Sequence, residues 1–240
     1  GAVFRGFNSM KVMTNSRLLS LGLLTLAASA TTARGDVMTL TFQNVSPGAD
    51  VTYSLDSNAT TRSTTAGVMN WVGGYETFCV QLEEYVSGGN QYIYDVRDVA
   101  DVPDLEPGAM GAFRAGLIED LYARNYASID SAEDAAAFQV AIWEIVHERG
   151  DTTAGGLTLG NLGLSTGTAR FNVGAGSDVV SLASGLLAGL GGGSETYLGF
   201  GGLRGLSNEQ YQDQLIVVPG PGAIAGMIGV AAMRRRRRRG

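Results

Sequence analysis

The sequence predicts an α+β protein, an antiparallel β-sandwich or barrel with an inserted helical subdomain. Two observations lead to this prediction. Alternating apolar residues, together with 35 glycines in 240 residues, favour short strands joined by many turns. Near residues 106–149 the apolar spacing changes to that of helices, so these helices are expected as an insertion. Residues 36–218 are expected to form this domain, and the segments on either side of it carry other signals.

The strands are expected where apolar and polar residues alternate. In residues 36–45, Met38, Leu40 and Phe42 share one face. The segment 51–55 is expected to be the partner strand of 36–45. The other expected strands are one or two within 69–86, one at 91–99 and a last one at 211–218.

Three helices are expected. The first covers 106–126, with Pro107 in its first turn, and the second covers 131–149. Ser131 is a suitable N-cap for the second helix, and Gly150 is a suitable stop. The third helix is expected at 177–190 and is followed by a Gly-rich turn region at 191–202.

The N-terminal segment, residues 1–35, has the pattern of a secretory signal. Residues 1–9 precede the first methionine and are interpreted as upstream of the true start. Lys11 and Arg17 then precede the apolar run 18–28, and small residues at 28–30 suit cleavage. A second candidate cleavage site lies near Gly35. The alternative, a buried N-terminal helix, fits this order of features less well.

The C-terminal segment, residues 219–240, has a turn, a short apolar run at 223–233 and a basic tail. The residues concerned are Pro219, Gly220, Pro221, Arg234, Arg235, Arg236, Arg237, Arg238 and Arg239. This order resembles the PEP-CTERM sorting signal of Gram-negative bacteria, although Gly220 replaces the central Glu and the run is shorter than the ~20 residues of a full span. The resemblance implies an exosortase-type processing enzyme as a partner, transient contact with the inner membrane through this transmembrane-type segment, and a secreted or cell-surface location.

Composition excludes several classes of function. Between Asp36 and Met233, seven Arg face all 23 acidic residues, and a charge of about −16 repels nucleic acid. A nucleic-acid-binding role for the Arg tail is disfavoured by the apolar run before it. One Cys and one His give no internal disulfide and no metal-site spacing, so no metal and no cofactor are expected.

Gln139 is an anomaly in the second helix. Its helical neighbours at offsets of three and four are apolar, and they include Ile142 and Trp143. A buried amide without a partner costs about 1–3 kcal/mol. Some other group is therefore expected to meet this side chain.

Cys79 supplies a candidate partner. It lies in a predicted strand within the sequence FCV, and residues 139–143 read QVAIW. This pair of motifs resembles the thioester domain of bacterial surface adhesins, which carries an aromatic-Cys strand motif and a later Gln-x-Ala-Ile-Trp helix motif. The resemblance covers roughly residues 70–150. It departs from the family at Phe138, where the family often has Thr, and in the Gram-negative type of the sorting signal.

The resemblance implies an internal thioester between Cys79 and Gln139. Phe138, Ile142 and Trp143 are then expected to shield this bond from water. His147 follows on the same helix face and is a candidate modulator of acyl transfer. The expected function is covalent attachment of an exported surface or extracellular-matrix protein to a nucleophile-bearing partner, used once per molecule, so the protein is not expected to be an enzyme.

Other interpretations stay open at this point. Cys79 and Gln139 can simply be packed in the core of a non-catalytic structural protein of the cell surface or exopolysaccharide matrix. A local link from Cys79 to Gln81 is disfavoured, and a Cys-x-x-Gln ring is excluded because the matching position is Leu82. Glu144 and Glu148 are expected on a solvated helix face.

Overall fold

The computed structural model describes residues 36–55, 60–149, 157–172, 178–193 and 196–218. The secretory signal predicted in 1–35 and the sorting signal predicted in 219–240 lie outside these residues. Within the described ranges, none of the helices combines the length and the apolar character needed to cross a membrane.

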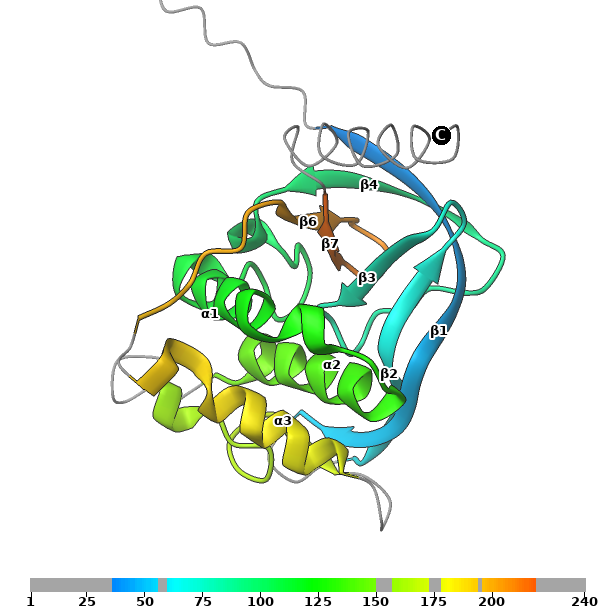
Figure 1. Cartoon of the computed structure of the whole chain (residues 1–240). Helices are drawn as coiled ribbons and strands as arrows, with labels where there is room; N and C mark the ends of the chain where they lie inside the picture. The colour runs from blue at the N-terminus through cyan, green and yellow to red at the C-terminus, as the bar shows by residue number, and fades with distance from the viewer. Residues whose placement is uncertain (1–35, 56–59, 150–156, 173–177, 194–195, 219–240) are drawn as a thin grey trace, which may run out of the picture. The chain divides into compact units, whose positions relative to one another are not determined.

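Strands and helices combine in an α+β fold with one large antiparallel sheet, which confirms that part of the prediction. The seven strands are β1 (Val37–Ser54), β2 (Arg62–Trp71), β3 (Tyr75–Cys79), β4 (Gln91–Arg97), β5 (Arg170–Asn172), β6 (Leu203–Ser207) and β7 (Gln214–Val217). They are ordered β2-β3-β7-β6-β4-β1-β5, and β1 also pairs with β2. Figure 1 shows the three helices on one side of these strands.

The prediction of two paired strands at 36–45 and 51–55 was wrong, because both segments belong to the single strand β1. Segments 36–45 and 51–55 were expected to pair with each other, whereas they are successive parts of one 18-residue strand. That strand pairs with β4 in its first part, with β2 through most of its length and with β5 at its end. Two register irregularities in the β1–β2 pairing, between Phe42 and Asn44 and between Val45 and Gly48, absorb the residues that look like a turn in the sequence.

Three α-helices occur, at positions close to those predicted. They are α1 (Gly111–Asn125), α2 (Ala132–His147) and α3 (Val179–Ala188), and the short 3-10 turns are η1 (Val99–Asp101), η2 (Tyr126–Ser128), η3 (Leu159–Asn161) and η4 (Leu190–Gly193). In α2, the Ser131 hydroxyl accepts a hydrogen bond from the Asp134 backbone, which confirms the predicted N-cap. The helix α1 starts at Gly111, beyond Pro107, so its predicted start was too early.

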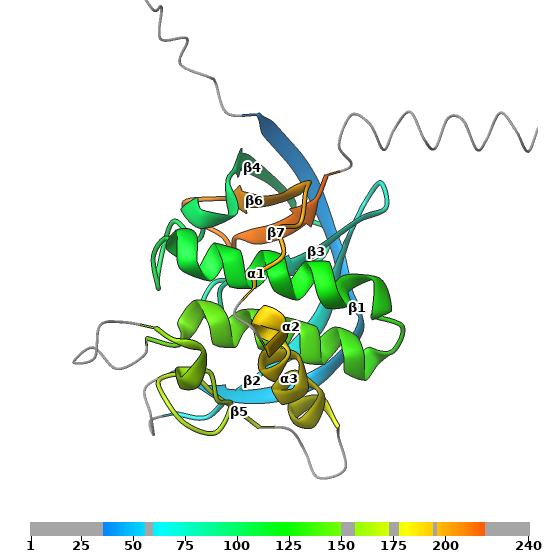
Figure 2. The same ribbon diagram turned by 60° about the vertical axis from the view of Figure 1, so that its left-hand side comes forward.

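The helix α2 lies at the centre of the fold. It contacts β1 and β2 of the sheet and both other helices, and Figure 2 shows it running beside α1. Every residue from Ala135 to His147 is buried. A helix enclosed in this way must satisfy each polar side chain within the protein, which makes its buried Gln and Glu residues informative.

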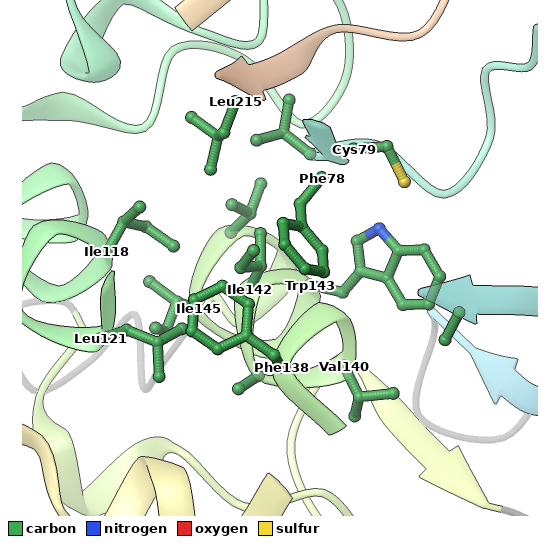
Figure 3. Close-up of a cluster of buried hydrophobic side chains, with 14 of the residues drawn as sticks. Phe78, Cys79, Ile118, Leu121, Phe138, Val140, Ile142, Trp143, Ile145 and Leu215 are labelled. Atoms are coloured by element: carbon green, nitrogen blue, oxygen red, sulfur yellow. The ribbon is translucent and has the colours of Figure 1, made fainter. Parts of the chain in front are cut away.

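An aromatic cluster joins α2 to the strand β3. The ring of Phe138 lies 4.9 Å from Phe78 of β3 and 4.9 Å from Tyr122 of α1, measured between ring centroids. Figure 3 shows the rings of Phe78 and Phe138 together with the nearby aliphatic side chains Ile118, Leu121 and Ile145. This contact fixes the position of β3 on α2.

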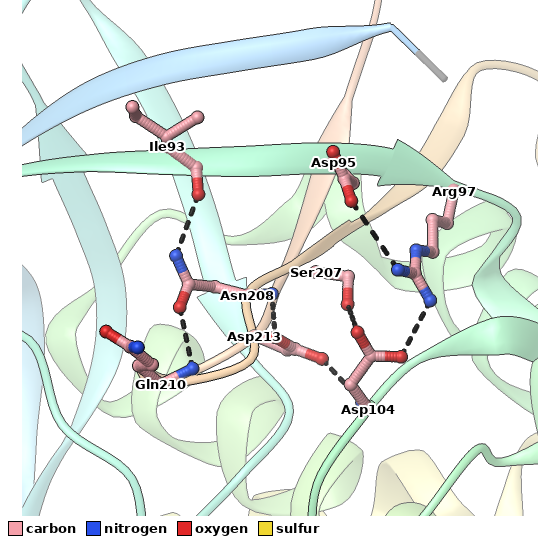
Figure 4. A network of polar contacts seen from close by, with 8 residues as sticks. All are labelled: Ile93, Asp95, Arg97, Asp104, Ser207, Asn208, Gln210 and Asp213. Atoms are coloured by element: carbon pink, nitrogen blue, oxygen red, sulfur yellow. Dashed lines mark hydrogen bonds and ion pairs between the residues drawn. The ribbon is translucent and has the colours of Figure 1, made fainter. Parts of the chain in front are cut away.

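A polar network holds the strand β7 in place next to β3. The Asp213 carboxylate accepts hydrogen bonds from the backbone N–H groups of Asp104 and Asn208, and Asp104 also pairs with Arg97 at 2.7 Å. Figure 4 shows this network between β4 and the turn that precedes β7. Burial raises the pKa of Asp213 to about 6. The network anchors β7, whose Gln214 is the sheet partner of Cys79.

Candidate functional site

The structure brings Cys79 and Gln139 into direct contact. The Cys79 backbone N–H donates to the Gln139 side-chain oxygen at 3.0 Å, and the Gln139 amide nitrogen donates to the Cys79 carbonyl at 2.7 Å. The thiol sulfur lies 3.5 Å from the same Gln139 oxygen. Because that oxygen is about 1.2 Å from its carbon, the sulfur is also close to the side-chain carbonyl carbon.

This contact results from two elements distant in sequence. Cys79 is the last residue of β3, and alternation along the strand turns Phe78 toward the aromatic cluster and Cys79 away from it. Gln139 lies one helical turn before Trp143 on α2. Both Cys79 and Gln139 are buried, with 5% and 1% of their surface exposed, so water has little access to the pair.

The Gln139 amide pairs with the backbone of Cys79. It accepts one hydrogen bond and donates one, as a strand neighbour would. This accounts for the polar side chain within an apolar helix. The Cys79 N–H also points at the oxygen on which negative charge would develop if the thiolate attacked the amide.

Cys79 is a free, buried thiol. Burial raises its pKa to about 12, and this effect is opposed in part by the indole N–H of Trp143 and by the backbone. The thiol is therefore protonated at neutral pH. Any attack by the sulfur requires that its proton be removed as the new bond forms.

Of the three residues predicted to shield the thioester, only Trp143 faces the thiol. Figure 3 shows the indole nitrogen of Trp143 directed toward the Cys79 sulfur, while Phe138 and Ile142 lie in the apolar cluster with Phe78. Phe138 and Ile142 are fully buried and belong to the packing of the core.

Phe171 was not identified from the sequence. It belongs to the three-residue strand β5, and its ring is stacked on Trp143, with centroids 6.2 Å apart and planes within 7°. Phe171 therefore packs against the indole ring of Trp143, which faces the thiol. The only signal in the sequence is an isolated aromatic residue between Gly-rich stretches, which is too weak to predict this contact.

His147 contacts the backbone of Val80, the residue that follows Cys79. Its Nε2 atom is 3.2 Å from the Val80 carbonyl, and with the proton on Nε2 the ring donates to that oxygen. Burial lowers the pKa of His147 to about 4, so the ring is neutral at neutral pH. His147 thus contacts the main chain immediately after Cys79.

Glu144 and Glu148 are buried, so the prediction of a solvated face was wrong. The Glu144 carboxylate accepts from the Gly163 N–H at 2.7 Å, and Glu148 accepts from the Thr168 N–H at 2.8 Å. The segment 157–172 covers this face of α2, and nothing in the helix sequence indicates that cover. Burial raises the pKa of Glu144 to about 8.

The alternative partner Gln81 is occupied elsewhere. Its side-chain oxygen accepts from the Asp213 backbone at 2.7 Å, and its nitrogen donates to the Glu106 carbonyl at 3.3 Å. Leu82 is buried in the core. Within the described residues no group of His, Cys, Asp or Glu side chains is arranged to hold a metal ion. The predicted sorting residues at 219–221 and 234–239 lie outside the described part of the chain.

The chain shows no significant match to known protein-family models, to characterised proteins or to solved structures. The function is therefore inferred from the geometry around Cys79 and Gln139.

Proposed function

We propose that Cys79 and Gln139 form an internal thioester through which an exported surface or matrix protein attaches covalently to a partner. The observation that supports this proposal best is the 3.5 Å contact between the Cys79 sulfur and the Gln139 side-chain oxygen, together with the N–H bond to that oxygen. A buried thiol beside a buried carboxamide is the pair of groups that the reaction needs.

The proposed formation step conserves all atoms. The Cys79 sulfur bonds to the Gln139 side-chain carbon, the carbon–nitrogen bond breaks, and the thiol proton leaves with the nitrogen as ammonia. The Cys79 N–H stabilises the oxygen while it carries negative charge. The Gln139 nitrogen is held by the Cys79 carbonyl until it departs.

The proposed attachment step uses an amine or a hydroxyl group of the partner. This nucleophile bonds to the Gln139 carbon, its proton passes to the sulfur, and Cys79 is released as a thiol. The product is an amide or an ester that stays in place, so each molecule reacts once and the protein is not an enzyme. The near-complete burial of the pair would slow the competing reaction with water.

We extend the proposal to export, sorting and His147. The signals predicted in 1–35 and 219–240 would direct the protein to the cell surface or medium of a Gram-negative-type bacterium, with an exosortase-type enzyme and transient inner-membrane contact. His147 would modulate the acyl transfer indirectly, by holding the Val80 carbonyl and thus the end of β3.

A second candidate is a structural protein of the cell surface or exopolysaccharide matrix in which the two residues are only packed. The specific observation that favours it is the reciprocal pairing of the Gln139 amide with the Cys79 backbone, since a side chain held by such hydrogen bonds needs no reaction to explain its burial. The high pKa of Cys79, about 12, also disfavours the thiolate.

Methylamine distinguishes the two candidates. If the thioester is present, methylamine should become attached at Gln139 and release one thiol at Cys79, and peptide mapping would locate both changes. If the residues are only packed, methylamine should leave Gln139 unmodified and the thiol count unchanged. A Cys79→Ala variant treated in parallel controls for nonspecific labelling.

We also infer that the sheet is a barrel rather than a sandwich. The inference is supported by the pairing of β1 with both β4 and β2, which returns the strand order to its start. In a closed sheet, β3 has no free edge. Cys79 would then be held rigidly opposite Gln139.

A further inference from the structure

The indole N–H of Trp143 is buried and unsatisfied. Only 1% of Trp143 is exposed, and its Nε1 atom has no hydrogen-bond partner of ordinary geometry in the described part of the chain. Figure 3 shows this nitrogen directed toward the sulfur of Cys79. A thiol sulfur is a weak acceptor, so the N–H gains little from it in the neutral state.

Trp71 provides the comparison within the same core. Its indole N–H donates to the Thr77 hydroxyl at 2.8 Å, so this fold satisfies a buried indole where an oxygen is at hand. The indole N–H of Trp143 faces the Cys79 sulfur instead of an oxygen. Its ring is also held from behind by the stacked ring of Phe171.

We propose that Trp143 donates its Nε1–H to the Cys79 sulfur when that sulfur carries negative charge. The role rests on the proposed thioester and deepens it. The N–H would stabilise the thiolate as it attacks Gln139, and again as it leaves when the partner's nucleophile displaces it. Trp143 is therefore assigned a part in the reaction, beyond shielding the site from water.

The physical reason is the difference between the two states of the sulfur. Hydrogen bonds to charged acceptors are about twice as strong as those between neutral groups. A donor whose hydrogen bond is weak to the neutral thiol and strong to the charged sulfur lowers the barrier to reaction. The neighbouring His147 supplies no positive charge for this purpose, because burial lowers its pKa to about 4.

The test uses a background in which no thioester can form. In Gln139→Ala protein, alkylation of Cys79 by iodoacetamide below its pKa proceeds at a rate proportional to the thiolate fraction. Adding Trp143→Phe should slow alkylation about tenfold, the factor expected for one lost hydrogen bond to a charged group. Adding Trp71→Phe, which removes an equal volume and an N–H bonded elsewhere, should change the rate less than about twofold.

The direction of the change makes the test decisive. Replacing Trp143 by a smaller ring opens space near the thiol, and better access alone would speed alkylation. A slower reaction therefore supports the donor, while an unchanged or faster reaction overturns it. Failure of the Trp143 proposal can be told apart from failure of the thioester proposal. The alkylation rate is measured in protein that cannot form a thioester, and methylamine labelling is measured with Trp143 intact.

A second measurement leaves Trp143 intact and covers the case in which Trp143→Phe fails to fold. Cys79→Ser offers the indole an oxygen acceptor, and Cys79→Ala removes the acceptor. The NMR signal of the Trp143 indole N–H should move in opposite directions in these two variants, while that of Trp71 stays in place. A Trp143 signal that is the same in both variants would refute the contact.

Discussion

The side-chain amide of Gln139 pairs with the backbone of Cys79 across 60 residues of sequence, through one accepted and one donated hydrogen bond. This relationship places the thiol next to the carbonyl group of Gln139, and it also gives the glutamine a structural role. The two roles involve different atoms of Cys79, the sulfur in one case and the main chain in the other. Substitutions can therefore separate them.

Cys79→Ala should be tolerated better than Gln139→Ala. The first substitution keeps both backbone groups that pair with Gln139 and should cost about 1–2 kcal/mol in unfolding free energy. The second leaves a buried N–H and a buried carbonyl without this partner and should cost about 2–4 kcal/mol. Urea denaturation measures both values. Equal costs would show that the reciprocal hydrogen bonds do not stabilise the fold.

Phe171 should protect the thioester from water more than Phe138 does. Phe171→Leu loosens the ring stacked on Trp143, which faces the sulfur, so hydrolysis of the bond should become several-fold faster. Phe138→Leu is the matched control, because Phe138 packs against Phe78 and Tyr122 on the other side of β3. Mass spectra followed over time report the uptake of water. Equal acceleration by both variants would contradict this assignment of the shield.

Glu144 should make the protein less stable as pH rises. Its pKa is raised from 4.5 to about 8 by burial, so between these values the folded state binds more protons than the unfolded state. The unfolding free energy must then fall with rising pH, by about 2 kcal/mol between about pH 6.5 and about pH 9.

Glu144→Gln removes this titration and keeps an oxygen that can accept from the Gly163 N–H. The variant should therefore lose about 2 kcal/mol less than the wild type over the same range, as measured by denaturation at each pH. The range lies above the pKa of Asp213, about 6, so that group contributes little. Parallel pH profiles for variant and wild type would mean that Glu144 ionises freely in the folded protein.

The mature protein should begin between Thr31 and Asp36 and end near residues 219–221. The reason is the signal-cleavage pattern at one end and the Pro-Gly-Pro turn before the apolar run at the other. Terminal peptides of protein recovered from the native host identify both ends. An extracellular form that still carries the Arg234–Arg239 tail would rule out the sorting part of the account.

The sequence predicted the elements with strong periodicity and missed those defined by distant contacts. The helix α2 was predicted with its N-cap because its apolar spacing and Ser131 are local features. The sequence predicts two separate strands in place of β1, because Pro47 and Gly48 resemble a turn, whereas these residues lie at an irregularity in the pairing of one strand. The sequence does not predict the strands β5 and β6, because RFN and LRGLS lie beside Gly-rich stretches and show no extended alternation of apolar and polar residues.

The candidate site was predicted in its two reacting residues and less well around them. Gln139 stood out because a carboxamide in an apolar helix must have a partner, and its spacing to Trp143 placed both on one face. Which way Phe138 points depends on how α2 packs on β3 and α1, and the helix sequence alone does not determine that. The stacking of Phe171 and the cover over Glu144 come from the segment 157–172, which has no clear periodicity.

The mass of the intact, freshly folded domain tests the central claim most directly. Formation of the thioester expels ammonia, so the wild type should weigh about 17 Da less than its sequence requires. Cys79→Ala and Gln139→Ala proteins, prepared identically, should each have their full sequence mass. A wild-type protein of full sequence mass, with one thiol that can be titrated after unfolding, would contradict the thioester and leave Cys79 and Gln139 as packed residues of the core.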